Sequence, residues 1–180
     1  MTVYFDYNAT CPVWPQSIAA MNAVFAAGPA NASSVHALGR AARKTIETAR
    51  EQVARAIGVA PKQIIFNSGA TEGNNTVLRF YRGSRLLISA TEHSSVYQTG
   101  LELNAAVIPV GSDGVVDVMA LDRMCAEGPA PALVSVMLAN NETGVINPVS
   151  DVARIAHRYG AALHVDAVQA FGKIPVDFGA

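Results

Sequence analysis

The stretch Ala162–Gln169, which reads ALHVDAVQ, decides how the chain is interpreted. It begins as a short buried strand, because Leu163 and Val165 are apolar and a helix stop at Gly160 precedes them. Asp166 lies at the carboxyl end of this strand, which is where open α/β sheets bind their ligands. Two interpretations of this carboxylate are open. It caps a following helix, as Asp often does, or it pairs with a cationic group of a ligand.

The composition is that of a folded protein. Hydrophobic residues make up 51% of the 180 residues and charged residues 15%, which excludes a disordered chain. A net charge of -1 provides no basic surface, so we expect no nucleic-acid partner. No apolar run reaches membrane-spanning length and no signal peptide is recognisable, so we expect no membrane partner. Cys11 and Cys125 show no metal-ligand spacing, which predicts reduced thiols, no metal site and a cytoplasmic protein.

Helical and strand-like patterns alternate along the chain, which predicts an α/β fold whose mostly parallel, mixed sheet is flanked by helices. The expected strands are residues 3–5, 63–66, 85–89, 106–110, 132–138 and 162–165. The expected helices include residues 15–27, 117–125 and four others that end near residues 57, 81, 103 and 159. The N-caps expected for three of those four are Ser33 or Ser34, Ser94 or Ser95, and Ser150. The second helix is the clearest, because an apolar stripe runs from Leu38 to Ile57 at spacings of three and four.

Polar groups follow four of the expected strands: Ser68 with Thr71, then His93, then Asn141, and finally Asp166 with Gln169. Each has a simpler interpretation, such as a capped helix start, a surface histidine or a polar turn closed by Gly144. If the strands are parallel, however, all four groups meet at one edge of the sheet. Together they offer a phosphate cup, an imidazole, an amide and a carboxylate. Such a set is able to hold a flat, anionic ring that accepts a proton.

The phosphate cup is predicted from the segment Asn67–Glu72, which links an expected strand to an expected helix through a small, glycine-containing turn. This layout presents backbone N–H groups and the positive end of a helix dipole to an anion. Ser68 and Thr71 add hydroxyl donors. No lysine follows the glycine, so the segment is not a Walker loop.

Several segments resemble a known family, the pyridoxal-phosphate (PLP)-dependent cysteine desulfurases. These are class-V aminotransferases of the group that serves nitrogen fixation and iron–sulfur cluster assembly. The matching segments are YFDYNAT, NASSVHALGR, SGATEGNN, ATEHSSV, ANNETGVINPV and HVDAVQAFGKIPVDF. They cover almost the whole chain in the family's order. One departure is Ala32, where the family normally has proline.

The resemblance implies a PLP-dependent transferase of fold type I and assigns roles by position. Ala70 and Thr71 would bind the cofactor phosphate. His93, the implied catalytic residue, would stack on the pyridine ring and assist proton transfers. Asn141 would lie near the phenolic oxygen of the cofactor and near the substrate.

Asp166 would then pair with the ring nitrogen and Gln169 would hydrogen-bond the phenolic oxygen. A carboxylate in that position keeps the pyridine nitrogen protonated, so that the ring withdraws electrons from the substrate.

Two residues of the family have no counterpart here. The Schiff-base lysine belongs to a Ser-x-His-Lys segment that the 180 residues do not contain, and the catalytic cysteine lies further on in the family's order. Lys173 matches a different segment, and neither Cys11 nor Cys125 matches the catalytic cysteine. We therefore expect an N-terminal segment, residues 1–15, and an incomplete PLP-binding large domain, residues 16–180. The 180 residues alone are expected to be inactive.

By resemblance, the function is cysteine desulfuration: L-cysteine gives L-alanine, and the sulfur passes as a persulfide towards iron–sulfur cluster assembly. The implied partners are L-cysteine, a second copy in a homodimer, and sulfur-acceptor or scaffold proteins. Two alternatives stay open at this point. One is a related PLP-dependent selenocysteine lyase or aminotransferase, and the other is a non-catalytic truncated module for dimerisation or scaffolding.

Overall fold

The structure is a computed structural model that describes residues 3–176 and residue 178. The chain divides into two compact units, of which the first includes residues 3–65 and the second is residues 66–176. The boundary that the sequence suggests between residues 15 and 16 stays a prediction.

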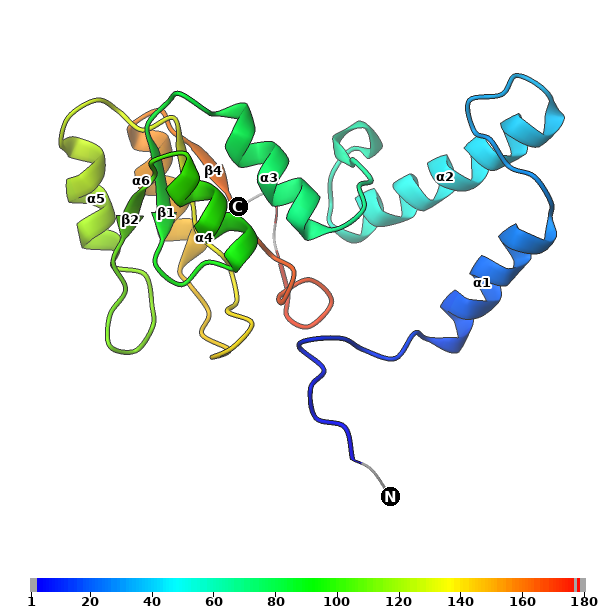
Figure 1. Ribbon diagram of the computed structural model, residues 1–180, viewed down its shortest axis with the longest axis horizontal. Coiled ribbons are helices and arrows are strands. Elements are labelled where there is room, and N and C mark those ends of the chain that lie inside the picture. The colour runs from blue at the N-terminus through cyan, green and yellow to red at the C-terminus, as the bar shows by residue number, and fades with distance from the viewer. Residues whose placement is uncertain (1–2, 177, 179–180) are drawn as a thin grey trace. The chain divides into compact units, whose positions relative to one another are not determined.

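The first unit is helical. Helix α1 (Pro15–Ala26) begins with proline at its first position, where the missing N–H costs nothing. Helix α2 (Ala37–Ala56) is followed by the short 3-10 helix η1 (Pro61–Gln63) (Figure 1). Arg50 of α2 contacts Glu47 at 3.1 Å and donates a hydrogen bond to the carbonyl of Ile64. This arginine holds the segment after η1 against α2.

Two expected strands in this unit are wrong. Residues 3–5 and 63–66 form no strand, and Phe5 and Ile65 are 88% and 84% exposed. Ile64 has an extended backbone, but no neighbouring strand pairs with it in the described part of the chain. An extended segment without a ladder partner is not a strand, because the ladder hydrogen bonds define it.

The second unit is built on a four-stranded sheet. Its strands are β1 (Leu86–Ser89), β2 (Ala106–Ile108), β3 (Leu133–Ser135) and β4 (Ala162–His164). They lie in the order β2-β1-β3-β4, and every pair of neighbours is parallel. Figure 1 labels three of them, β1, β2 and β4. The α/β class, the parallel pairing and the four strands expected in this region are confirmed.

Helices cover both faces of the sheet. Each of α4 (Ser94–Glu102), α5 (Val118–Ala126) and α6 (Val149–Arg158) crosses from one strand to the next, and α3 (Ala70–Phe80) precedes β1. Leu86 and Ile88 pack with Leu78 of α3 and Val96 of α4. Leu87, between them, packs against the opposite cluster, as the alternation of strand side chains requires.

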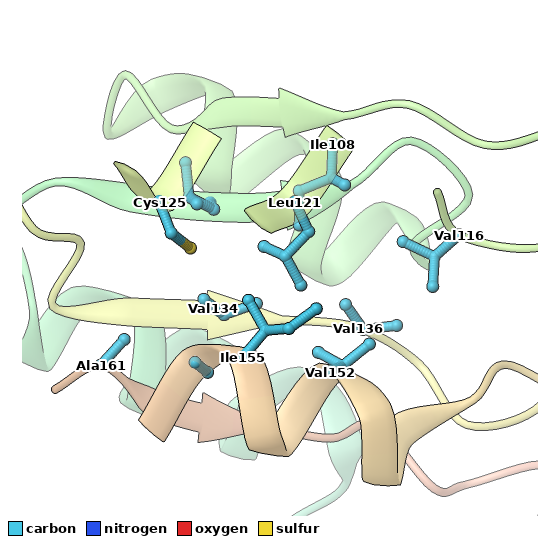
Figure 2. Close-up of a cluster of buried hydrophobic side chains, with 11 residues drawn as sticks. Ile108, Val116, Leu121, Cys125, Val134, Val136, Val152, Ile155 and Ala161 are labelled. Carbon is cyan, nitrogen blue, oxygen red and sulfur yellow. The ribbon is translucent and has the colours of Figure 1, made fainter. Parts of the chain in front are cut away.

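The opposite cluster contains α5 and α6. Figure 2 shows Leu121 and Cys125 of α5 and Val152 and Ile155 of α6 around Val134 of β3. Because both faces of the sheet are buried, its strands are apolar at nearly every position. Within the described residues, no helix is both long enough and apolar enough to cross a lipid bilayer.

The strand order places a topological switch point between β1 and β3. The chain leaves β1 towards β2 on one side, and the later strands β3 and β4 are added on the other side. Open α/β sheets bind ligands in the crevice beyond the carboxyl ends of the two strands at such a point. The fold therefore predicts a ligand site between the loops that follow β1 and β3.

Three expected helix caps are corrected. His36 caps α2 in place of Ser33 or Ser34, since its Nδ1 accepts from the Gly39 amide at 3.3 Å. His93 caps α4 in place of Ser94 or Ser95. Helix α6 already starts after Pro148, so that Ser150 lies inside the helix and cannot cap it. A neutral imidazole nitrogen accepts a hydrogen bond as a hydroxyl does, but histidine is not among the preferred N-cap residues.

Candidate cofactor site

The loops after β1 and β3 separate where the two strands end. The chain after β3 stays paired with the chain after β4, because the amides of Val136 and Leu138 donate to the carbonyls of His164 and Asp166 at 3.1 and 2.9 Å. On the β1 side, the amide of Met137 donates instead to the Glu92 side chain, at 2.6 Å. A side chain thus replaces the missing strand partner, and the crevice opens at the switch point.

The crevice is lined by residues 90–94 after β1 and residues 140–143 after β3, and it encloses about 390 Å³. This volume lies within the range of small-molecule sites. His93 and Asn141, which the sequence places after two different strands, both line it. Asn140 ties its two walls together, because its Nδ2 donates to the carbonyl of Thr91 at 2.9 Å.

Asn140 also shapes the second wall. Its Oδ1 accepts from the amides of Glu142 and Thr143, both at 2.9 Å, which forms an Asx-type turn. Gly144 closes the turn with a φ of 73°, a conformation that glycine adopts without strain. The simpler interpretation of this segment, a polar turn, is therefore also correct.

Asp166 is buried beside this crevice, with 6% of its surface exposed. Along β4, Ala162 packs on the α3 side of the sheet, and Asp166 follows it at an even spacing on the same side. Its Oδ2 accepts from Asn74 Nδ2 of α3 at 2.8 Å, and its Oδ1 accepts from the Val168 amide at 3.0 Å. No α-helix follows Asp166 in the described residues, so the helix-cap interpretation is wrong and the cap-like bond closes a turn.

A continuous set of hydrogen bonds connects Asp166 to His93. Asn74 Nδ2 lies 2.9 Å from Ser95 Oγ, and Ser95 Oγ lies 2.8 Å from His93 Nδ1. We call these four residues the Asp166–His93 network. It brings together two predicted site residues from different strands through two residues that the sequence analysis did not select.

Ala70 and Thr71 lie in the first turn of α3. The Asn75 side chain joins this turn to α4, because its Nδ2 donates to the Thr71 carbonyl at 2.9 Å and to the Ser95 carbonyl at 3.3 Å. No side chain caps α3 in the described structure, so the N–H groups of its first turn are available to an anion. Hydrogen bonds therefore link Asp166 to His93 and connect the first turn of α3 with α4, while Thr71 and Asp166 themselves do not line the crevice that contains His93 and Asn141.

Two residues predicted for the site, Ser68 of the phosphate cup and Gln169, form hydrogen bonds with neighbouring side chains. Ser68 contacts Glu72 Oε2 through its hydroxyl at 2.5 Å and its amide at 2.8 Å. These bonds lower the pKa of the Glu72 carboxyl. Gln169 Oε1 accepts a hydrogen bond from Lys173.

The site also contains a buried acid, Glu92. Glu92 is 9% exposed, and its Oε2 has no hydrogen-bond partner within the described part of the chain. Burial is the main reason why the pKa of Glu92 is raised to about 7. The hydrogen bond from the Met137 amide lowers this pKa, and the negative charge of Asp166 raises it further. Nearby, burial lowers the pKa of His164, whose Nδ1 lies 2.9 Å from Ser135 Oγ.

Two features of the site fit PLP. Asp166 is a buried carboxylate that accepts hydrogen bonds from the uncharged N–H groups of Asn74 and Val168, and it forms no ion pair with any described residue. A buried carboxylate is stabilised by a cationic partner, and a protonated pyridine nitrogen is one. The uncapped start of α3 suits the phosphate. No cluster of three or more metal-ligating side chains occurs among the described residues.

Comparisons with known proteins agree with this geometry. The sequence pattern of the family described as Aminotransferase class-V matches residues 3–180. The chain belongs to the class-V aminotransferase family. This family and its cysteine desulfurases are PLP-dependent.

The relatives narrow the assignment within the family. The chain is 41% identical to "Cysteine desulfurase IscS" of Anaeromyxobacter sp. (strain K), over 97% of this chain and 46% of that protein. It is similar to the crystal structure of a NifS-like protein from Rickettsia africae, with a TM-score of 0.93, 35% identity, and coverage of 98% of this chain and 51% of the other. A structure described as SspA in complex with cysteine has a TM-score of 0.88 at 29% identity, covering 98% and 53%. The chain thus spans about half the length of these relatives.

Proposed function

We propose that these 180 residues form the cofactor-binding face of a PLP-dependent cysteine desulfurase. The observation that carries the proposal is the buried carboxylate of Asp166, joined to His93 by hydrogen bonds at the carboxyl edge of the sheet. The 41% identity to a cysteine desulfurase supports this activity over that of a selenocysteine lyase or another aminotransferase.

In this proposal each predicted site residue contacts a different part of the cofactor. The first-turn N–H groups of Ala70 and Thr71 bind the cofactor phosphate, and Asp166 pairs with the protonated ring nitrogen. His93 and Asn141 line the crevice beside the ring, and Gln169 hydrogen-bonds the phenolic oxygen. When bound, PLP supplies an electron-withdrawing ring that stabilises negative charge on the substrate.

The proposed reaction is the conversion of L-cysteine to L-alanine, with transfer of the sulfur to acceptor or scaffold proteins of iron–sulfur cluster assembly. The similarity to a structure described in complex with cysteine supports the substrate. We propose a homodimer in the cytoplasm. No residue of the 180 corresponds to the family's Schiff-base lysine or persulfide cysteine, so the chain tested by itself is expected to bind PLP without turnover.

The test is a comparison of two ligands on two proteins. PLP and an analogue with a C–H group in place of the ring nitrogen are titrated, by absorbance, into the wild-type chain and Asp166→Asn. A hydrogen bond between charged groups contributes about 1.5–3 kcal/mol, so the wild type should prefer PLP by roughly 10- to 100-fold. The variant should lose this preference, because an uncharged amide does not pair with a pyridinium.

Equal affinity of the wild type for the two ligands would refute the assignment of Asp166. A longer protein that adds the family's lysine and cysteine segments tests the activity itself. It should release one alanine for each sulfur transferred from cysteine. Transamination of cysteine without sulfur release would contradict the desulfurase proposal.

A further inference from the structure

We infer that Asn74 and Ser95 are positioning residues that fix the tautomer of His93, with the ring proton on Nε2. This inference deepens the proposed function and rests on it for its consequence in catalysis. Its structural basis is the Asp166–His93 network, in which each hydrogen bond has only one compatible direction.

The direction starts at Asp166. Its carboxylate accepts hydrogen bonds and donates none, so the atom of Asn74 that faces it at 2.8 Å must be the amide nitrogen. A flipped Asn74 would place two acceptor oxygens against each other in a buried site, because Asn74 is 5% exposed. The acid thereby fixes the orientation of the asparagine side chain.

The second amide hydrogen of Asn74 is directed to Ser95. Asn74 Nδ2 donates to Ser95 Oγ at 2.9 Å, so this hydroxyl oxygen acts as an acceptor towards α3. Its own hydrogen is then free to point at His93 Nδ1, which lies 2.8 Å away. The Ser95 hydroxyl therefore accepts a hydrogen bond from Asn74 and donates one to the imidazole of His93.

His93 Nδ1 therefore faces two donors. Besides the hydroxyl of Ser95, the backbone N–H of the same residue donates to Nδ1 at 3.1 Å, as part of the cap of α4. A proton on Nδ1 would oppose both donors, so Nδ1 is the unprotonated nitrogen. The neutral ring then carries its hydrogen on Nε2.

The consequence concerns how His93 acts in the crevice. A neutral imidazole with Nδ1 occupied offers Nε2–H, which is a hydrogen-bond donor and not a base. We infer that His93 meets the ligand as a donor, and that the charge of Asp166 maintains this state from the far end of the network. A general-base role for the resting imidazole is incompatible with this arrangement.

The test is long-range ¹H–¹⁵N NMR of the histidine side chains in the ligand-free chain, recorded where the rings are neutral. The wild type should show at least a tenfold excess of the Nε2–H tautomer at His93, the factor that about 1.4 kcal/mol provides. His157 on the exposed side of α6 serves as the internal reference. A proton on Nδ1 of His93 in the wild type would overturn the inference without any variant.

Two variants test the positioning residues. Ser95→Ala removes the hydroxyl donor, and Asn74→Asp draws that hydroxyl to a new carboxylate and away from the imidazole. Each should reduce the tautomer excess several-fold, towards the ratio of His157. Gln98→Ala, on the exposed face of α4, is the matched control and should leave the ratio unchanged.

An unchanged tautomer ratio of His93 in folded Ser95→Ala would refute the role of the network. Because this variant removes only one oxygen atom, it still tests the inference if Asn74→Asp fails to fold. Because no cofactor is present, the outcome is independent of PLP binding. A chain that fails to bind PLP but shows the Nε2–H tautomer would refute the proposed function and leave this inference standing.

Discussion

Glu92 makes the stability of this protein depend on pH in a direction opposite to that of most carboxylates. Its pKa lies at about 7 in the folded chain, against an ordinary value of 4.5, chiefly because the side chain is buried. The folded state therefore holds a proton that the unfolded state releases. This contribution to stability is fully present below about pH 4.5 and is lost as the pH rises through about 7.

The magnitude follows from the two pKa values. Each pKa unit corresponds to about 1.4 kcal/mol, so the whole effect amounts to about 3 kcal/mol. Between about pH 5 and about pH 8.5, the window accessible to a urea titration, roughly 2.5 kcal/mol of it should be lost. Glu92→Gln keeps the acceptor for the Met137 amide but carries no titrating group, so its stability should not show this loss.

The assay is urea unfolding of the wild type and Glu92→Gln at a series of pH values. The difference between their free energies of unfolding should change by roughly 2.5 kcal/mol across the window, in favour of the variant at high pH. The pKa of His164 is lowered by burial, so its contribution to the stability of the protein is lost as the pH falls. His164 is present in both proteins, so this contribution cancels in the difference between their free energies of unfolding. Glu142→Gln, an exposed glutamate of the same crevice, is the control and should track the wild type. Parallel curves for the wild type and Glu92→Gln would refute the reasoning.

Two further predictions concern the scaffold of the site. Leu121→Ala removes a fully buried side chain from the cluster between α5 and α6 and should lower the free energy of unfolding by about 2–5 kcal/mol, measured with urea, while PLP affinity of the folded chain is unchanged. Loss of PLP affinity in folded Leu121→Ala would place the ligand elsewhere. Asn140→Ala frees the carbonyl of Thr91 and opens the turn after β3, so it should cost about 1–3 kcal/mol and also weaken PLP binding. Wild-type PLP affinity in this variant would show that the two walls of the crevice need not be tied.

The sequence predicted which polar residues lie at this edge of the sheet better than it predicted the hydrogen bonds between them. The position of His93, Asn141 and Asp166 at the edge was predictable because polar side chains directly after apolar strands must lie at one edge of a parallel sheet. Asn74 was not selected, although it lies one turn before the buried Leu78 on the inner face of α3. Its partner Asp166 is 92 residues away, and only the packing of α3 beside β4 brings them together.

The errors also have physical causes. The apolar segment 63–66 has the composition of a strand, but strand formation depends on a neighbouring strand that composition does not reveal. The caps were misplaced by a few residues because His36 and His93 accept hydrogen bonds that serine was expected to accept. Glu92 was passed over because a glutamate in a polar loop gives no sign in the sequence that the loop folds inward.

The central claim is that separate loops of one sheet edge hold a single PLP molecule. The most direct test is a ¹H–¹⁵N NMR titration of the chain with PLP, following the backbone amides. The amides of Thr71, His93, Asn141 and Asp166 should shift together and saturate with one dissociation constant. Amides that stay unchanged at these four positions, while others shift or PLP binds elsewhere, would contradict the account.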